Sequence, residues 1–498
     1  MIVTGQIRKG AYFDSVTLMR VGKEIGSLPG VIDAAIVMGT KANKAILNSS
    51  GLLRAQFSNA SDTDLLVAVK AKTEDAGQSA LAGVDALLKK TAKTTASTEV
   101  PSVNLRGALD MLPDANLALI SIAGRYAGDE AMRALENGLH VMLFSDNVPL
   151  EKEIALKKFA AKRGLLVMGP DCGTAIINGV PLAFANVVNR GNIGIVAAAG
   201  TGLQEVSCLI SNAGAGISQA IGTGGRDVKK EVGGMMFIEA LKALAKDEQT
   251  KVILLVSKPP HPQVLNRIKK VLKSIRKPVV TMFIGASDST LEEAALTAVA
   301  LSQRKKSDDV AKQLTARNIE IQRIAKREAG KRKNGQKYVR GLFSGGTFCA
   351  EAQILFSQML TGVYSNAPTG KARQLKNSLK SQKNTVIDLG EDEFTVGRPH
   401  PMIDYSLRNK RILEEAADPE TAVILLDVVL GYGSNPDPAS ELACVIRQAR
   451  RNVSVVCSIT GTDKDPQNRS RVEAALRKAG AIVMPSNAAA CKLAGSII

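Results

Sequence analysis

Histidine and aromatic residues are scarce in this sequence. Its 498 residues include three histidines and no tryptophan, and aromatic residues make up only 3% of the chain. The six cysteines are scattered and form no C-x-x-C pair, so the spacing of a structural zinc site is missing and we predict no metal site. Single, scattered cysteines are typical of a reducing compartment, which predicts a cytoplasmic protein.

Long apolar runs are also missing. No stretch approaches the roughly 20 apolar residues that a membrane helix needs. The first residues, MIVTGQIRKG, lack the apolar segment of a signal peptide. We therefore expect neither a membrane span nor export. Hydrophobic residues make up 45% of the chain, which is enough for buried cores, and the length predicts three or four domains at roughly 150 residues each.

The net charge of +18 is concentrated in part at one segment. Residues 302–337 contain 12 Lys and Arg against 4 Asp and Glu, a net charge of 12 − 4 = +8. A basic segment of this kind can indicate nucleic-acid binding, but aromatic residues that would stack on bases are sparse. We therefore interpret the segment as a basic connector and expect no nucleic-acid partner.

Apolar strands alternate with amphipathic helices along most of the chain. This alternation predicts an α/β fold in which parallel sheets are covered on both faces by helices. A Thr/Ser-rich stretch with a proline, residues 91–104, indicates a linker. The predicted parts are a small α/β N-terminal domain (1–92), a Rossmann-like domain (105–190), a flavodoxin-like domain (191–301), the basic linker (302–337) and a second flavodoxin-like domain (338–498).

Two segments about 145 residues apart are built alike. GIVAAAGTGLQEV (194–206) and GLFSGGTFCAEA (341–352) each indicate a strand, a Gly/Ser/Thr turn and a helix start. Such a turn directs free backbone N–H groups and the positive end of a helix dipole at one point, which suits phosphate. The alternative is that the glycines only let each helix pack tightly on its strand. The residues predicted to bind phosphate are Gly200, Thr201, Gly202, Ser344, Gly345, Gly346 and Thr347.

Polar residues also follow several predicted strands. The carboxyl ends of parallel strands are where open α/β sheets bind ligands. For each of these residues the alternative is a solvated turn or a surface loop. The predicted catalytic residues are Lys258, His261 and His400. The predicted substrate-binding residues are Gly224, Gly225, Arg226, Arg398 and Asp427. We expect His140 and Cys172 to be structural.

The middle and the end of the chain resemble known ligases. LLVMGPDCGTAIING (165–179), GNIGIVAAAGTGLQEV (191–206) and AIGTGGRDV (220–228) resemble the α subunit of succinyl-CoA synthetase and related NDP-forming acyl-CoA synthetases. The C-terminal part resembles the last domain of the β subunit, with GLFSGGTFCAEA in the matching position. In these synthetases two such helices flank the phosphate. The resemblance implies succinyl-CoA synthetase-like domains, with residues 105–190 as the CoA-binding-like domain, and gives CoA as the one cofactor to consider, by analogy of fold.

The FdrA family is a closer resemblance. SKPPHP (257–262), GLFSGGT (341–347), GRPHPMID (397–404) and DVVLGYGSNPDP (427–438) resemble its signatures. This family joins the two ligase parts behind an extra N-terminal domain. The resemblance implies a subunit of an oxamate carbamoyltransferase of allantoin degradation, with phosphate, carbamoyl phosphate and oxamate-like acids as small anionic substrates. It also implies that the protein acts together with separate partner subunits. We expect the protein to form a homo-oligomer, to bind partner subunits, or both.

One departure from the synthetases affects the expected chemistry. They carry phosphate on a histidine in a G-H-A-G-A loop, and the matching stretch here, GASDSTLEEA (285–294), has no histidine. A phosphohistidine relay cannot run without its nucleophile. The ATP-grasp half of the β subunit also has no counterpart. We therefore predict that phosphate is a reactant. An acyl-CoA synthetase and a non-catalytic scaffold that senses acyl-CoA or phosphate remain the alternatives.

Overall fold

The computed structural model describes residues 1–11, 13, 15–93, 104–286, 289–395 and 399–498. They form two compact units, one made of Met1–Asp114 and Glu391–His400 and the other of Ala115–Gly390 and Pro401–Ile498. Both units are α/β, which confirms the predicted fold class. In the part of the chain that the structure describes, no helix is both long and apolar enough to cross a membrane.

The first unit is built on a small antiparallel sheet. Its strands are β1 (Ile2–Arg8), β2 (Val31–Met38) and β3 (Leu65–Ala71), in the order β1-β3-β2. The central β3, LLVAVKA, is buried at six of its seven positions because apolar cores lie on both of its faces. The helical elements are α1 (Ser15–Gly26), α2 (Lys41–Ser49), a 3-10 turn (Ala55–Asn59), α3 (Glu74–Lys93), α4 (Leu105–Met111) and α13 (Asp392–Thr395).

The second unit begins with a three-stranded parallel sheet. Its strands β4 (Leu117–Ile120), β5 (His140–Leu143) and β6 (Val167–Met168) lie in sequence order, with α5 (Gly124–Glu136) and α6 (Leu150–Lys162) between them. Residues 174–183, predicted to lie in the Rossmann-like domain (105–190), pair with the next sheet, and the boundary at residue 190 stays a prediction. Three strands in one direction are half of a doubly wound Rossmann sheet.

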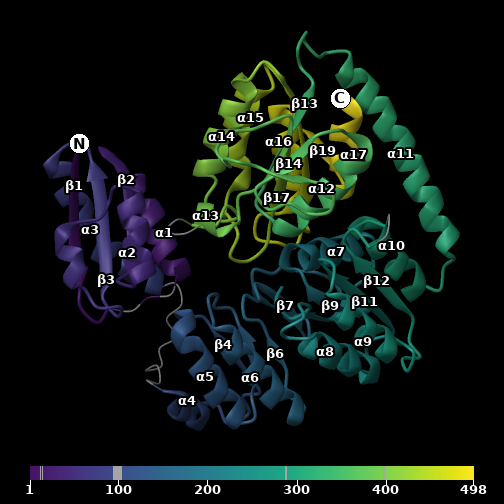
Figure 1. The fold of residues 1–498 in the computed structure, drawn as a ribbon, viewed down its shortest axis with the longest axis horizontal. Helices are drawn as coiled ribbons and strands as arrows, with labels where there is room; N and C mark the ends of the chain where they lie inside the picture. Colours follow the sequence, from purple (N-terminus) through teal and green to yellow (C-terminus); the bar gives the residue numbers. More distant parts are fainter. Residues whose placement is uncertain (12, 14, 94–103, 287–288, 396–398) are drawn as a thin grey trace. The chain divides into compact units, whose positions relative to one another are not determined.

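The next sheet has six strands in the order β12-β11-β9-β10-β7-β8. The hairpin of β7 (Thr174–Ile177) and β8 (Val180–Ala183) is antiparallel to its neighbours, and the other four strands are parallel. These four are β9 (Arg190–Ala198), β10 (Ile217–Gly222), β11 (Val252–Ser257) and β12 (Val279–Phe283). Helices α7 (Gly200–Asn212) and α10 (Leu291–Ser302) cover one face, and α8 (Met235–Lys246) and α9 (Pro262–Leu272) cover the other (Figure 1).

The last sheet has seven parallel strands in the order β15-β14-β16-β13-β17-β18-β19. They are β13 (Tyr338–Phe343), β14 (Val363–Ser365), β15 (Arg373–Gln374), β16 (Asn384–Asp388), β17 (Thr421–Val429), β18 (Ser454–Thr460) and β19 (Ile482–Met484). The helices are α12 (Gly346–Met359), α14 (Ser406–Ala417), α15 (Pro438–Ala449), α16 (Arg469–Ala479) and α17 (Asn487–Ile497). The basic connector forms α11 (Ser307–Ala329).

Both larger sheets share one strand order. With the edge strands β7 and β8 left out, the strands β9 to β12 follow the flavodoxin order 2-1-3-4. With β14 and β15 left out, the strands β13 and β16 to β19 follow the order 2-1-3-4-5. Their helix-covered faces meet, because one continuous core joins residues of α7 and α10 to residues of α12 and α17. The first helix of each flavodoxin-like part is therefore buried against the other part.

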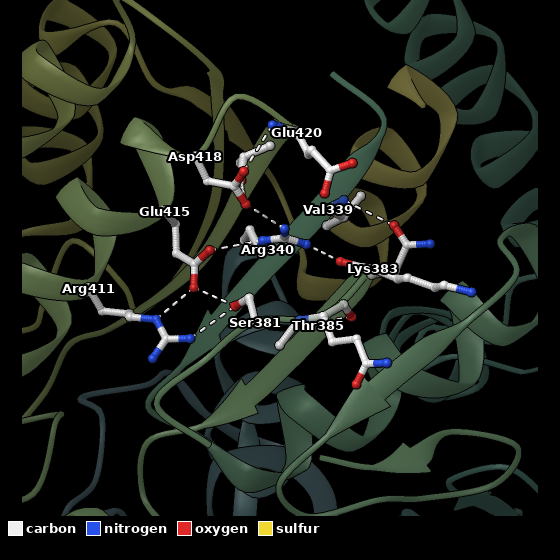
Figure 2. A network of polar contacts seen from close by, with 12 residues as sticks. Val339, Arg340, Ser381, Lys383, Thr385, Arg411, Glu415, Asp418 and Glu420 are labelled. Carbon is white, nitrogen blue, oxygen red and sulfur yellow. Dashed lines mark hydrogen bonds and ion pairs between the residues drawn. The ribbon is translucent and has the colours of Figure 1, made fainter. Parts of the chain in front are cut away.

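Two clusters of buried ion pairs lie inside the second unit. Figure 2 shows Arg340 of β13 donating to the carboxylates of Glu415 and Asp418, at 2.9 and 2.8 Å. Glu415 also accepts from Arg411 at 2.6 Å. A second cluster centres on Lys157 of α6, whose Nζ donates to Asp227 Oδ1 at 2.9 Å and so ties α6 to the loop before α8. These charges are buried but paired, as buried charges must be.

Candidate functional site

Both predicted phosphate turns lie where the strand order of their sheet reverses. α7 follows β9, which pairs with β10 on one side and β11 on the other. α12 follows β13, which pairs with β16 and β17. In a flavodoxin-like sheet the crevice between the first and third strands is the usual ligand position. Each turn therefore occupies the position at which its own sheet is expected to bind a ligand.

The structure brings the two helix starts into contact. A Cβ atom on Gly202 would stand 2.8 Å from Thr347 Cγ2, and one on Gly345 would stand 2.8 Å from Thr201 Oγ1. Larger residues at either glycine would push the helices apart. The two turns predicted from separate segments thus form one locus between the flavodoxin-like parts, although the binding of phosphate there stays a prediction.

Neither helix start is capped by its own side chain. The N-cap residues are Ala199 for α7 and Gly345 for α12, and neither makes a side-chain cap hydrogen bond. The first N–H groups of a helix have no partner within the helix. Gly200 is exposed, and Thr201 and Gly346 are partly exposed. Two positive helix ends therefore meet at a place that solvent reaches, an arrangement that favours an anion.

Two of the predicted phosphate ligands need correction. The N–H groups of Ser344 and Gly345 donate to the carboxylate of Asp427, at 2.8 and 2.9 Å, and the Ser344 hydroxyl donates to it as well. These two N–H groups are therefore already used. In the second turn, the N–H groups left to donate to a phosphate are those of Gly346 and Thr347. Sequence reasoning missed this because the partner lies 82 residues further along the chain.

Asp427 acts as an internal anchor for the second turn. Asp427 is fully buried within β17, and its carboxylate also accepts a hydrogen bond from Arg408 at 3.1 Å. Burial raises the pKa of Asp427, while the Arg408 guanidinium opposes that rise. Both of its oxygens have donors within the protein. Its predicted contact with substrate stays untested, and its observed contacts are those of a residue that holds the turn.

Two charged residues lie beside Gly346. A Cβ atom on Gly346 would stand 3.7 Å from Lys258 Nζ and 2.6 Å from Asp388 Oδ2. Lys258 follows β11 directly, as predicted, and it is half-buried. Asp388 was not predicted, although it ends the strand within TVIDLG, and that position was the signal available in the sequence. Lys258 and Asp388 thus place a cation and a carboxylate beside the first residue of α12.

A buried glutamate in each helix clamps the opposite part. Glu205 and Glu351 occupy the same position, the sixth residue, of α7 and α12. Glu205 accepts from the Asn487 N–H at the start of α17, at 2.9 Å. Glu351 accepts from the Leu291 N–H at the start of α10, at 2.8 Å. Each first helix thus caps the last helix of the other part, and these crossed contacts fix the two helix starts relative to each other.

This clamp predicts a dependence of stability on pH. Burial raises the pKa of Glu351 to about 7 from 4.5, so the folded protein keeps a proton that the unfolded chain has released. The resulting stability is complete below about pH 4.5 and is lost as pH rises through about 7. Glu351→Gln should therefore flatten the fall in the free energy of unfolding between about pH 5 and pH 8, by roughly 1–3 kcal/mol.

Urea unfolding at a series of pH values measures this effect. Glu414→Gln, at an exposed glutamate of α14, is the control and should leave the slope as it is in the wild type. An unchanged slope in Glu351→Gln would show that the proton resides on another group.

Other predicted site residues have local structural contacts. His261 caps α9 by accepting from the Gln263 N–H at 3.3 Å. Arg226 pairs with Glu153 at 2.9 Å and donates to the Val148 carbonyl at 2.8 Å. Gly224 has φ +80° and lies so close to the Pro170 carbonyl oxygen that a Cβ would stand 2.3 Å from it. The loop of residues 224–226 thus packs on the preceding sheet, and ligand roles for these residues and Gly225 stay predictions.

The remaining predicted residues lie outside this locus or outside the described residues. Arg398 is outside the described residues, and His400 belongs to the first unit. His140 accepts from the Leu166 N–H through Nδ1, and burial lowers its pKa. Cys172 is buried, and burial raises its pKa to about 12, so it has no thiolate at neutral pH. Among the described residues no group of three or more His, Cys, Asp or Glu side chains could hold a metal ion.

Three sequence families match parts of the chain. Residues 342–497 match the CoA-ligase family and residues 188–285 the CoA binding domain family. Residues 1–102 match a family described as AllF, heavy metal-associated domain. This last segment contains neither cysteine nor histidine.

Individual proteins match at different levels. A succinate–CoA ligase [ADP-forming] subunit alpha 1 from Archaeoglobus fulgidus is 28% identical over 34% of this chain, which spans 59% of that subunit. The solved structure of dinucleotide forming acetyl-coenzyme A synthetase 1 from Ca. Korarchaeum cryptofilum, in complex with phosphate and ADP, is 15% identical. It covers 77% of this chain and 82% of its own, with a TM-score of 0.30.

One relative matches almost end to end. The Escherichia coli protein named uncharacterized protein YahF is 40% identical over 97% of this chain and 96% of its own length. The chain therefore belongs to the family of YahF, with a CoA-ligase domain and a CoA-binding domain as its recognisable parts.

Proposed function

We propose that the paired starts of α7 and α12 bind a phosphate group as a reactant, and that the chain is a subunit of a phosphate-dependent carbamoyl or acyl transferase. The observation that carries this proposal is the contact between two uncapped helix starts at two sheet switch points. Lys258 beside Gly346 adds a cation. The stretch 285–294 has no histidine to accept the phosphoryl group. Residues 1–102 match a family of their own, and an extra N-terminal domain before the ligase parts is what the FdrA-type resemblance implies.

The chemistry follows from where negative charge develops. When carbamoyl phosphate is used, an amide nitrogen of an oxamate-like acid attacks the carbonyl carbon. The bond from that carbon to the phosphate oxygen breaks, and phosphate leaves with the electron pair. The helix N-termini and Lys258 stabilise the charge on the leaving phosphate. The nitrogen gives up its proton to a base, a role that the carboxylate of Asp388 can take from its place beside Gly346.

The second candidate is an NDP-forming acyl-CoA synthetase. The CoA-ligase and CoA-binding matches favour it. It requires CoA, a nucleotide and a phosphorylated intermediate. The CoA-binding match covers residues 188–285, which form β9 to β12 and not the β4-β5-β6 sheet. With no histidine in 285–294, this candidate lacks the expected phosphoryl acceptor.

Titration calorimetry tests the first proposal on the whole chain. We expect phosphate and carbamoyl phosphate to bind the wild-type protein, and acetate at equal ionic strength not to bind. Phosphate release from carbamoyl phosphate on addition of oxamate, with partner subunits present, then separates a transferase from a scaffold that only senses the ligand. If neither phosphate nor carbamoyl phosphate binds, the proposal fails.

Labelling separates the two enzymatic candidates. After incubation with γ-labelled ATP and CoA, a synthetase would carry label on the protein, and the proposed transferase would carry none. Acid-labile label on this chain would overturn the transferase proposal in favour of the synthetase.

A further inference from the structure

A cavity in the second unit lies at the opposite end of the last sheet from the candidate site. It has a volume of about 480 Å³ and opens at the amino ends of β17, β18 and β19, where Ala422, Ser454 and Ile482 line it. The candidate site lies at the carboxyl end of the same sheet, beyond β13 and β16. Because the strands are parallel, the two places are separated by the length of the strands.

The basic connector forms one wall of this cavity. Arg327 lies in the last turn of α11, and Lys331, Arg332 and Lys333 follow in the turn after it. The Nε atom of Arg332 is buried and has no hydrogen-bond partner among the described residues. Lys333 is held toward the sheet by its contact with Asn452 Oδ1 at 3.3 Å. Four of the 12 Lys and Arg residues of the basic connector thus line a concave surface.

The flavodoxin-like part supplies the facing wall. Arg450 and Arg451 follow α15, and Arg477 lies in the last turn of α16. Arg450 is packed against Gly480, where a Cβ would stand 2.3 Å from Arg450 Cδ. Among the described residues, no carboxylate forms an ion pair with Arg450 or Arg451.

The cavity contains a large excess of positive charge. Seven Lys and Arg side chains line it against one carboxylate, Glu328, a balance of 7 − 1 = +6. Glu328 is already engaged by Arg327 at 3.1 Å and Lys331 at 2.7 Å. A concave surface of one charge sign concentrates counter-ions, and grouped cations repel one another until an anion neutralises them.

From this arrangement we infer that the cavity is a second ligand site, which takes a small polyanion carrying two or more phosphate groups. The volume is in the range of small-molecule sites, about 300–1,000 Å³. Arginine forks suit phosphate oxygens. No aromatic residue lines the cavity, so a stacking surface for bases is absent from it. This favours a compact phosphate compound over a single-stranded nucleic acid.

Calorimetric titration with inorganic triphosphate tests the inference on the full chain. We expect binding at about 50 mM KCl that weakens as salt is added, because the attraction is between charges. The double variant Lys333→Glu/Arg451→Glu, at two exposed positions, should weaken triphosphate binding on the order of a hundredfold. Arg323→Ser, at an exposed arginine of α11 outside the cavity, is the matched control and should bind as the wild type does.

A third variant separates the two sites. Lys258→Met lies in the candidate phosphate site and should leave unchanged the part of triphosphate binding that the double variant removes. The inference is overturned if triphosphate does not bind, if Arg323→Ser weakens binding as much as the double variant, or if Lys258→Met abolishes it. A single-stranded oligonucleotide that binds through the same residues more tightly than triphosphate would overturn the assigned ligand class.

Discussion

Replacing Gly346 with aspartate is expected to abolish phosphate binding at the paired helix starts. The new carboxylate would stand at the first residue of α12, beside Asp388 and within the space that the proposed phosphate occupies. Two like charges about 4 Å apart repel by about 4 kcal/mol at an effective dielectric constant near 20. Since a factor of ten in affinity is about 1.4 kcal/mol, the loss should be on the order of a hundredfold or more. Titration calorimetry with phosphate measures it.

Two further variants make this result specific. Ser440→Asp adds the same charge at an exposed position in the first turn of α15 and should leave phosphate affinity unchanged. Lys258→Met removes the neighbouring cation without adding bulk at the glycine, and should weaken binding roughly ten- to hundredfold. Wild-type affinity in both Gly346→Asp and Lys258→Met would place the phosphate elsewhere.

Replacing Glu415 with leucine is expected to destabilise the protein strongly. Its carboxylate lies between the buried guanidinium of Arg340 and that of Arg411, and it also accepts from the Ser381 hydroxyl (Figure 2). Removing it leaves two cations with little solvent around them. Breaking a buried ion pair in this way costs about 3–5 kcal/mol. Urea denaturation, read as the free energy of unfolding, measures the change.

The adjacent residue provides a matched control. Glu414 is exposed and its contact with Lys410 is long, at 3.8 Å. Exposed pairs of this kind contribute at most about 1 kcal/mol, so Glu414→Leu should change stability little. Equal effects of the two substitutions would contradict the account of a buried network.

The strand–helix alternation was enough to predict the α/β fold, because buried parallel strands are continuous apolar runs. VILLVS of β11 and TAVILLDVV of β17 are examples. The sequence could not show that TAII and VPLA pair with the next sheet. Both strands are short, TAII pairs with β10 more than 30 residues away, and VPLA pairs with TAII.

The helix starts were predicted as two separate signals, and their contact could be expected only through the family resemblance. The sequence could not show that the N–H groups of Ser344 and Gly345 donate to the Asp427 carboxylate and are therefore not free to bind phosphate. Asp388 and Glu351 were also missed. The position of Asp388 at a strand end was a signal in the sequence, but a carboxylate inside a helix, such as Glu351, has no distinctive spacing, and its partners come from segments far away in the chain.

A crystal structure of the protein soaked with carbamoyl phosphate or phosphate tests the central claim most directly. The account predicts a phosphate group between Gly200–Gly202 and Gly346–Thr347, accepting from backbone N–H groups of both helices and lying near Lys258 Nζ. A phosphate bound by only one helix, bound away from this locus, or joined covalently to a side chain would contradict it.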